Sequence, residues 1–191
     1  MADASNPPNK GSALKKVLIG IVAVVAIFLV VVAMQPSEFT VTRSASIAAP
    51  ASSVFPYVND LHQWEKWSPW EKVDPAMKKT YEGPGSGLNA SYGWAGNHEV
   101  GEGRMTITES KPNELVRMKL EFFKPMQGTN DVTFSFKQDG AQTGVTWTMS
   151  GPKSFVSKAV CMFMNMDKMV GGMFEKGLSD LKASAEAPAK K

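Results

Sequence analysis

The sequence has few of the residues from which disulfides and metal sites are built. Cys161 is the only cysteine, so the chain can form no internal disulfide and has no cysteine pair for a metal. His62 and His98 lie far apart, outside the spacings of helical metal-binding motifs. We therefore expect no metal and no cofactor, and we interpret both histidines as surface or hydrogen-bonded side chains.

The chain also lacks a strong charge of either sign. Its formal net charge is +3, and Lys10, Lys15 and Lys16 against Asp3 supply two of those charges near the N-terminus. The remaining basic and acidic residues nearly balance, and no basic stripe is present. This composition gives no electrostatic reason to expect a nucleic-acid partner.

One long run has no charged or polar side chain at all. Residues 17–34 read VLIGIVAVVAIFLVVVAM and follow a polar leader, residues 1–16. As a helix at about 1.5 Å per residue, the run is about 27 Å long, close to the roughly 30 Å of a bilayer core. The pattern predicts a transmembrane helix over residues 17–34.

A cleaved signal peptide is the alternative, because Val31 and Ala33 suit a cleavage site with small residues. The apolar region of such signals usually spans about 7 to 15 residues, and this run is longer. We therefore favour a retained single-pass anchor. Lys15 and Lys16 precede the run, which predicts a cytoplasmic N-terminus and an extracytoplasmic domain; in the alternative, the domain is secreted after cleavage.

The next part of the chain alternates between apolar and polar residues, as strands with one buried face do. The chain has 191 residues, 43% of them hydrophobic, enough for one domain with a substantial core. Residues 39–47 form the first predicted strand, in which Arg43 alone breaks the apolar face, and residues 51–59 form a short helix after Pro50. Later apolar faces comprise Leu88, Ala90, Tyr92 and Trp94; Met105 and Ile107; Val116, Met118, Leu120 and Phe122; Val132, Phe134 and Phe136; Val145, Trp147 and Met149. Short turns between them predict an antiparallel meander.

Residues 153–185 change to helical spacing and predict one long helix. Its apolar residues form two adjacent stripes, which together cover about half of the circumference, so we expect a curved sheet to wrap it. Gly171 and Gly172 indicate a close approach or a bend. The stripes are Val156, Val160, Phe163, Val170, Phe174, Leu178 and Leu181, and Phe155, Ala159, Met162, Met166, Met169 and Met173.

The order of these elements resembles a known family. SIAAPASSVFPYVNDLHQWEKWSPW, GLNASYGWAG, GEGRMTITESKPNELVRMKLEF, GVTWTMSG and MDKMVGGMFEKGLSDLK are similar to the START-like or SRPBCC superfamily, in particular its polyketide cyclase/dehydrase branch. The resemblance implies an α+β helix-grip fold over residues 37–185. It also implies a deep apolar cavity between the sheet and the C-terminal helix. We expect residues 186–191 to form a disordered tail.

Two groups of side chains have both a structural and a ligand-binding interpretation. Trp64, Trp67 and Trp70 follow one another at every third residue, and they either cap the core or border the cavity entrance. The methionine stripe is either ordinary core or the adaptable wall of a pocket. The ligand-binding candidates are Trp67, Trp70, Tyr92, Trp94, Met166, Met169 and Met173.

The sequence offers no catalytic constellation. Ser53 and Ser150 have no histidine or acid that the pattern brings near them. Alternation places several charged residues on the solvent side of the strands: Glu102, Arg104, Arg117, Lys119 and Glu121. Arg43, on an inward face, is expected to pair with an acid or to cap the cavity.

We therefore interpret the chain as a membrane-anchored domain that binds a hydrophobic small molecule or lipid. The alternatives are an enzyme of the cyclase or aromatase type that acts on a hydrophobic substrate, and a protein-interaction module that resembles stress-response members of the superfamily. The oligomeric state stays open.

Overall fold

The computed structural model describes residues 10–187, so residues 1–9 of the expected leader and residues 188–191 of the expected tail lie outside the described part. The chain divides into two compact units. Within the described residues, one comprises residues 10–37 and 153–164, and the other comprises residues 38–152 and 165–187. Each unit is described by itself.

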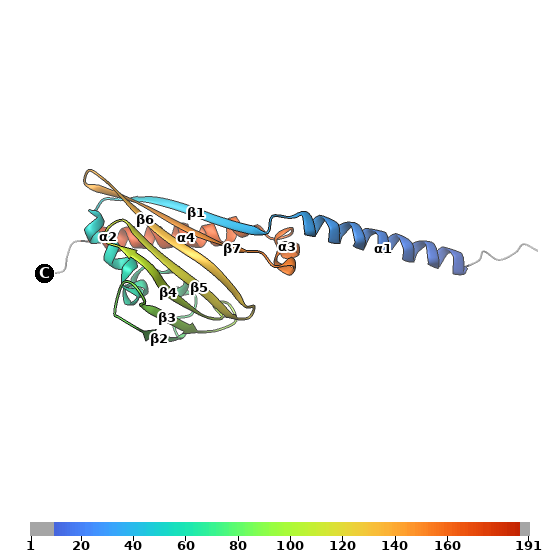
Figure 1. The fold of residues 1–191 in the computed structure, drawn as a ribbon, viewed down its shortest axis with the longest axis horizontal. Helices are drawn as coiled ribbons and strands as arrows, with labels where there is room; N and C mark the ends of the chain where they lie inside the picture. The colour runs from blue at the N-terminus through green and yellow to red at the C-terminus, as the bar shows by residue number, and fades with distance from the viewer. Residues whose placement is uncertain (1–9, 188–191) are drawn as a thin grey trace, which may run out of the picture. The chain divides into compact units, whose positions relative to one another are not determined.

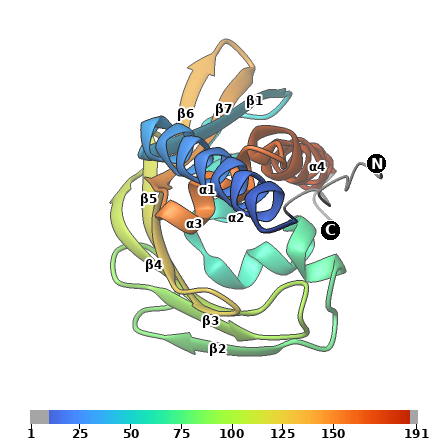
Figure 2. The same ribbon diagram turned by 90° about the vertical axis from the view of Figure 1, so that its right-hand side faces the viewer.

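The larger unit is built on a seven-stranded antiparallel sheet (Figure 1). Its spatial order is β1-β7-β6-β5-β4-β3-β2, so β2 to β7 form a meander and β1 pairs with β7. The sheet curls around the helices of this unit (Figure 2). The strands are β1 (Glu38–Ile47), β2 (Lys78–Glu82), β3 (Ser91–Ala95), β4 (Glu102–Lys111), β5 (Leu115–Lys124), β6 (Gly128–Asp139) and β7 (Gln142–Pro152). This confirms the predicted α+β helix-grip fold.

The buried face of the sheet is largely the one that alternation predicts. In β5, β6 and β7 the register brings together Val116 and Phe134, and then Phe134 and Trp147, all nearly inaccessible to solvent. Two details differ from the expectation. Leu88 is exposed because it precedes β3, and β2 was not predicted because this edge strand, KKTYE, lacks an apolar face.

Helix α2 (Ala51–Asn59) has the predicted bounds, and the tryptophan-rich stretch that follows it completes its C-terminal end. The last carbonyl groups of a helix lack partners within the helix. Here the indole Nε1 of Trp67 donates to the carbonyl of Tyr57 at 2.8 Å, and that of Trp64 donates to the carbonyl of Val58 at 3.0 Å. The 3-10 helices η1 (Leu61–Lys66) and η2 (Pro69–Lys72) carry these tryptophans and Trp70.

The single long helix expected over residues 153–185 is wrong. The region forms α3 (Phe155–Cys161) and α4 (Met166–Glu186), which belong to different units. The side chain of Asn165 accepts a hydrogen bond from the backbone N–H of Lys168 at 2.9 Å and so begins α4 as an N-cap. The buried side of α4 is narrower than the two predicted stripes. It comprises Gly171, Phe174, Gly177, Leu178 and Leu181.

Arg43 joins β1 to α4 by an ion-pair cluster. Its guanidinium lies 3.0 Å from both carboxylate oxygens of Asp167, and its Nε lies 2.6 Å from Glu175 Oε1. The hydrogen bond to Arg43 lowers the pKa of Asp167. A Cβ atom on Gly171 would collide with the guanidinium, so the glycine provides the expected close approach. Of the two roles expected for Arg43, acid pairing is the observed one.

The smaller unit contains α1 (Lys10–Met34) and α3. Within the described residues, Leu14–Met34 is the one helix long and apolar enough to cross a membrane, and a signal sequence has the same properties. Phe28 stacks on Phe163 with ring centroids 6.4 Å apart. The helix expected over residues 17–34 is thus present and extends further toward the N-terminus.

The buried register makes a stability prediction. Truncation of Phe134 to Ala removes a fully buried ring that contacts Trp64, Trp67 and Trp147, and it should lower the free energy of unfolding by about 3–5 kcal/mol. Urea denaturation measures this change. The matched control is Phe123→Ala, because Phe123 on neighbouring β5 is exposed and its loss should cost less than about 0.5 kcal/mol. Equal losses in the two variants would contradict the assigned inward face.

Candidate functional site

The larger unit contains a partly open cavity of about 210 Å³. Aromatic and aliphatic side chains form most of its wall, which is typical of small-molecule sites. The wall comprises Trp64, Ser68, Trp70 and Glu71 from the η1–η2 region; Met77, Tyr92, Trp94, Glu99, Val100, Met105, Leu120, Phe122, Val132, Trp147 and Met149 from the sheet and its loops; and Val170 and Phe174 from α4. The cavity therefore lies between the sheet and the C-terminal helix, where the family resemblance places it.

The predicted ligand-binding residues fall into two groups. Trp70, Tyr92 and Trp94 line the cavity together, and ligand binding by these three stays a prediction. Trp67 is completely buried and does not line it, because its indole is fixed against the end of α2.

The three methionines of α4 also lie off the wall. Met169 and Met173 directly precede Val170 and Phe174, so they are turned about 100° away from the residues that face the cavity. Met169 is exposed, and Met166 is the first residue of the helix. Methionine side chains do line the cavity, but they come from the sheet side: Met77, Met105 and Met149.

Trp147 is the centre of the aromatic part of the wall. Its ring stacks on Phe174 at a centroid distance of 4.0 Å and an interplanar angle of 9°. It also makes edge contacts with Trp64 and Trp70, which line the cavity too. Its indole Nε1 is buried and has no hydrogen-bond partner among the described residues. An unpaired buried N–H costs about 1–3 kcal/mol, so this donor is an unsatisfied polar group inside the aromatic cluster.

A short polar chain interrupts the apolar wall. Tyr92 Oη donates to Glu71 Oε1 at 2.8 Å, and Lys79 Nζ lies 2.6 Å from Glu71 Oε2 and 2.7 Å from Glu65 Oε1. The Glu71 side chain is only 9% exposed. Burial first, and then the hydrogen bond to Glu71, raises the pKa of Tyr92. Burial alone would lower the pKa of Lys79, but its two carboxylate partners outweigh that effect and raise it.

Sequence reasoning assigned no role to Glu71. The period-two rule does not apply to a 3-10 helix, so it could not place the side chain inside. The available signal was an acidic residue directly after Trp70 in a tryptophan-rich stretch. In contrast, the charged residues predicted to face solvent do not line the cavity. Among them, Arg104 and Lys119 both pair with Glu121.

The described residues contain no group of three or more His, Cys, Asp or Glu side chains that could hold a metal ion. His62 stacks on Tyr81 with ring centroids 3.9 Å apart, and its Nδ1 lies 3.1 Å from Asp60 Oδ1. The cavity wall itself is mainly apolar and carries the Tyr92–Glu71 phenol–carboxylate pair.

The family model for "polyketide cyclase / dehydrase and lipid transport" matches residues 38–186. The chain belongs to this family. No curated protein matches the chain in sequence. The family match covers the sheet, the cavity and α4, and it confirms the resemblance that the sequence motifs carry.

Solved structures of similar proteins support the same fold at low sequence identity. Protein CV1439 from Chromobacterium violaceum has a TM-score of 0.57 at 13% identity, over 78% of this chain and 98% of its own. The Aha1 dimer from Colwellia psychrerythraea has a TM-score of 0.56 at 15% identity, over 80% and 99% of the two chains. DynU16, a protein of the dynemicin biosynthetic locus, has a TM-score of 0.54 at 14% identity, over 78% and 47%. At such identities the likeness extends to the fold alone.

The buried phenol of Tyr92 makes a pH prediction. Its pKa in the folded protein is raised above the ordinary value of 10, so above about pH 10 the unfolded chain binds fewer protons than the folded one. Stability should therefore fall as pH rises from that point. Urea midpoints at about pH 8 and pH 11 should show a smaller alkaline loss in Tyr92→Phe than in the wild type, with Tyr81 accounting for part of the remainder because burial raises its pKa too. Parallel losses in the two proteins would contradict a protonated buried phenol.

Proposed function

We propose that this protein is a membrane-anchored domain that binds a small hydrophobic molecule in the cavity behind Trp70, Tyr92 and Trp94. The partly open apolar cavity is the observation that carries the proposal. Protein interiors are normally packed with few voids larger than a water molecule. A space of about 210 Å³ lined by rings and thioethers is therefore suited to an apolar guest.

The size of the cavity restricts the guest. An apolar cavity of about 150 Å³ stays dry and accommodates benzene. At about 210 Å³, the space suits a molecule with one or two small rings, or one arm of a larger amphipathic molecule. The description of the family includes lipid transport, and a lipid would place only part of one chain in the space as it stands.

The polar groups on the wall restrict its chemistry as well. Trp147 Nε1 has almost no accessible surface, so it offers no donor to a guest in the cavity as it stands. The Tyr92 hydroxyl already donates to Glu71, and its oxygen can accept. The wall therefore favours a mainly apolar guest, and the Tyr92 oxygen is an acceptor for a donor group on that guest.

An enzyme of the cyclase type is the second candidate, and one observation favours it. Tyr92 and Glu71 place a phenol–carboxylate pair on the wall of an apolar cavity, where a proton could pass to or from a bound carbonyl compound. The binding proposal needs no such step. Incubation of the extracted guest with fresh protein separates the two functions, because an enzyme converts it and a binding protein returns it unchanged.

Membrane anchoring by residues 17–34 is the second part of the proposal. The apolar side chains of the helix are mostly exposed over Leu14–Met34, which water would disfavour and lipid would accept. Lys15 and Lys16 at its start favour a cytoplasmic N-terminus and an extracytoplasmic domain. Secretion after cleavage is the alternative.

Ligand binding is tested by filling the cavity. Val170→Trp adds a ring to the cavity side of α4, so it should weaken the binding of a naphthalene-sized fluorescent probe by at least about tenfold. Met169→Trp is the matched control, because the adjacent side chain is exposed and off the wall. Probe titration measures the affinity, and thermal unfolding shows that each variant folds.

Two results bear against the binding proposal. Equal affinities in the two variants would place the probe outside the cavity. A wild-type protein that binds none of a series of apolar probes, and that yields no small molecule to solvent extraction and mass spectrometry, would favour the protein-interaction module.

The anchor makes a separate prediction. The full-length chain should sediment with membranes and resist extraction by alkaline carbonate, because a spanning apolar helix has no favourable aqueous state. N-terminal sequencing of the mature protein checks that the helix is retained. A soluble mature chain that starts near Met34 would establish cleavage in its place.

A further inference from the structure

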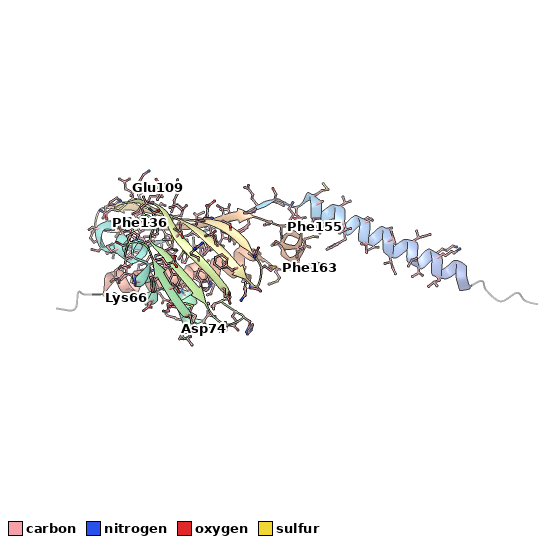
Figure 3. The ribbon with its side chains drawn as sticks, turned by 60° about the horizontal axis from the view of Figure 1, so that its bottom comes forward. Lys66, Asp74, Glu109, Phe136, Phe155 and Phe163 are labelled. Atoms are coloured by element: carbon pink, nitrogen blue, oxygen red, sulfur yellow. The ribbon has the colours of Figure 1, made fainter. Side chains whose placement is uncertain are left out.

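The segment 155–164 exposes an unusual amount of apolar surface. In ten residues it presents six exposed large hydrophobic side chains, and Lys158 is its only charged residue. Figure 3 labels Phe155 and Phe163, the two rings of the segment, which are 48% and 79% exposed. The other four are Val156 at 61%, Val160 at 43%, Met162 at 39% and Met164 at 47%. Contiguous apolar surface of this kind marks an interaction site.

This segment lies against the last turns of α1, within the same unit. Phe163 stacks on Phe28, and Val32, one turn further along α1, is fully buried. The backbone N–H of Lys153 donates to the carbonyl of Ser37 at 2.7 Å, just beyond the end of α1. Phe28 precedes Met34 by six residues, or about 9 Å along the helix axis. The segment thus follows α1 from its C-terminal end toward its middle.

The position of Phe28 along the bilayer normal indicates what covers the exposed rings of Phe155 and Phe163. If α1 spans a bilayer with Met34 near the surface, a side chain that stacks on Phe28 lies at the level of the acyl chains. The apolar surface of the segment is then continuous with that of the anchor. Lys153 and Lys158 are long enough to reach the headgroup layer from this position, as lysines at membrane interfaces do.

We propose that segment 155–164 inserts into the leaflet that α1 leaves at its C-terminal end and forms a second membrane contact. This proposal rests on the anchoring part of the proposed function. Lipid covers the exposed side chains of the segment. A consequence for the larger unit follows from the connection of the chain. β7 ends at Pro152 and α4 begins at Met166, directly before and after the segment in the chain. An inserted segment therefore keeps the end of β7 and the start of α4 near the membrane surface. Helix α4, which contributes Val170 and Phe174 to the cavity wall, then starts next to the membrane, in which apolar ligands dissolve.

The single cysteine of the chain provides the test, because Cys161 lies inside the segment. An environment-sensitive fluorophore is attached to Cys161 of the full-length protein, which is then reconstituted into vesicles of phosphatidylcholine and phosphatidylglycerol. Lipids with a quencher on the acyl chain should reduce the emission at least about threefold. The aqueous control is Ala141→Cys and the anchor control is Ala23→Cys, each with Cys161→Ser. Ala141 lies in the exposed β6–β7 turn and Ala23 within α1.

The exposed rings should be responsible for the insertion. Phe155→Ser with Phe163→Ser should bring the quenching of the Cys161 label to the level of the Ala141 label. Phe123→Ser, which removes an exposed ring from β5, should leave it unchanged. Quenching of the Ala23 label in the double variant shows that the protein is still anchored.

The outcomes separate this proposal from the anchor on which it rests. A quenched Ala23 label beside an unquenched Cys161 label would leave the anchor standing and overturn the second contact. Two unquenched labels would overturn both. A Cys161 label that is protected from aqueous iodide but insensitive to the lipid quencher would mean that protein covers the segment, such as a second copy of this chain, and would also overturn the proposal.

Discussion

The contact between Trp147 and Phe174 holds the larger unit together. It joins the last strand of the sheet to α4 by parallel rings 4.0 Å apart. A Cβ atom on Gly177 would lie 2.9 Å from the Trp147 ring, so a larger residue there would force the helix away from the sheet. Trp64, Trp67 and Trp70 surround the same ring and connect it to the segment after α2. Sheet, helix and cavity wall therefore depend on one aromatic cluster.

The same cluster explains why a cavity can persist inside a well-packed unit. Aromatic side chains have few rotatable bonds, and here hydrogen bonds from Trp64 and Trp67 to the end of α2 fix two of the rings. Rings that are held in this way cannot turn inward to fill the space. The carbonyl groups at the end of α2 need donors, and they obtain them from Trp64, which lines the cavity, and from Trp67, which packs against Trp64.

Sequence patterns predicted the sheet well because each strand has a single buried face. Alternation identified the inward residues of β4 to β7, and Pro50 indicated the start of α2. The helical region was harder to predict, because residues 155–164 and 166–186 share one apolar periodicity. The apolar side chains of α3 are nevertheless not buried, unlike several of those of α4. Periodicity also leaves the rotation of α4 about its axis open. A difference of one residue decides whether Met169 or Val170 faces the cavity, and packing of Phe174 on Trp147 sets it. Glu71 lies in a 3-10 helix, to which neither period applies.

The distribution of rigid and adaptable side chains determines how the cavity could accept a guest larger than its resting volume. Trp70, Trp147 and Phe174 form a rigid part, since each ring is in contact with another. The adaptable part is on the sheet side, where Met77, Met105 and Met149 line the space with flexible thioethers. A longer guest would therefore extend between the methionines and leave the aromatic cluster in place. Because the aromatic cluster also joins the sheet to α4, the cavity can enlarge in that direction without loss of the contacts on which the fold depends.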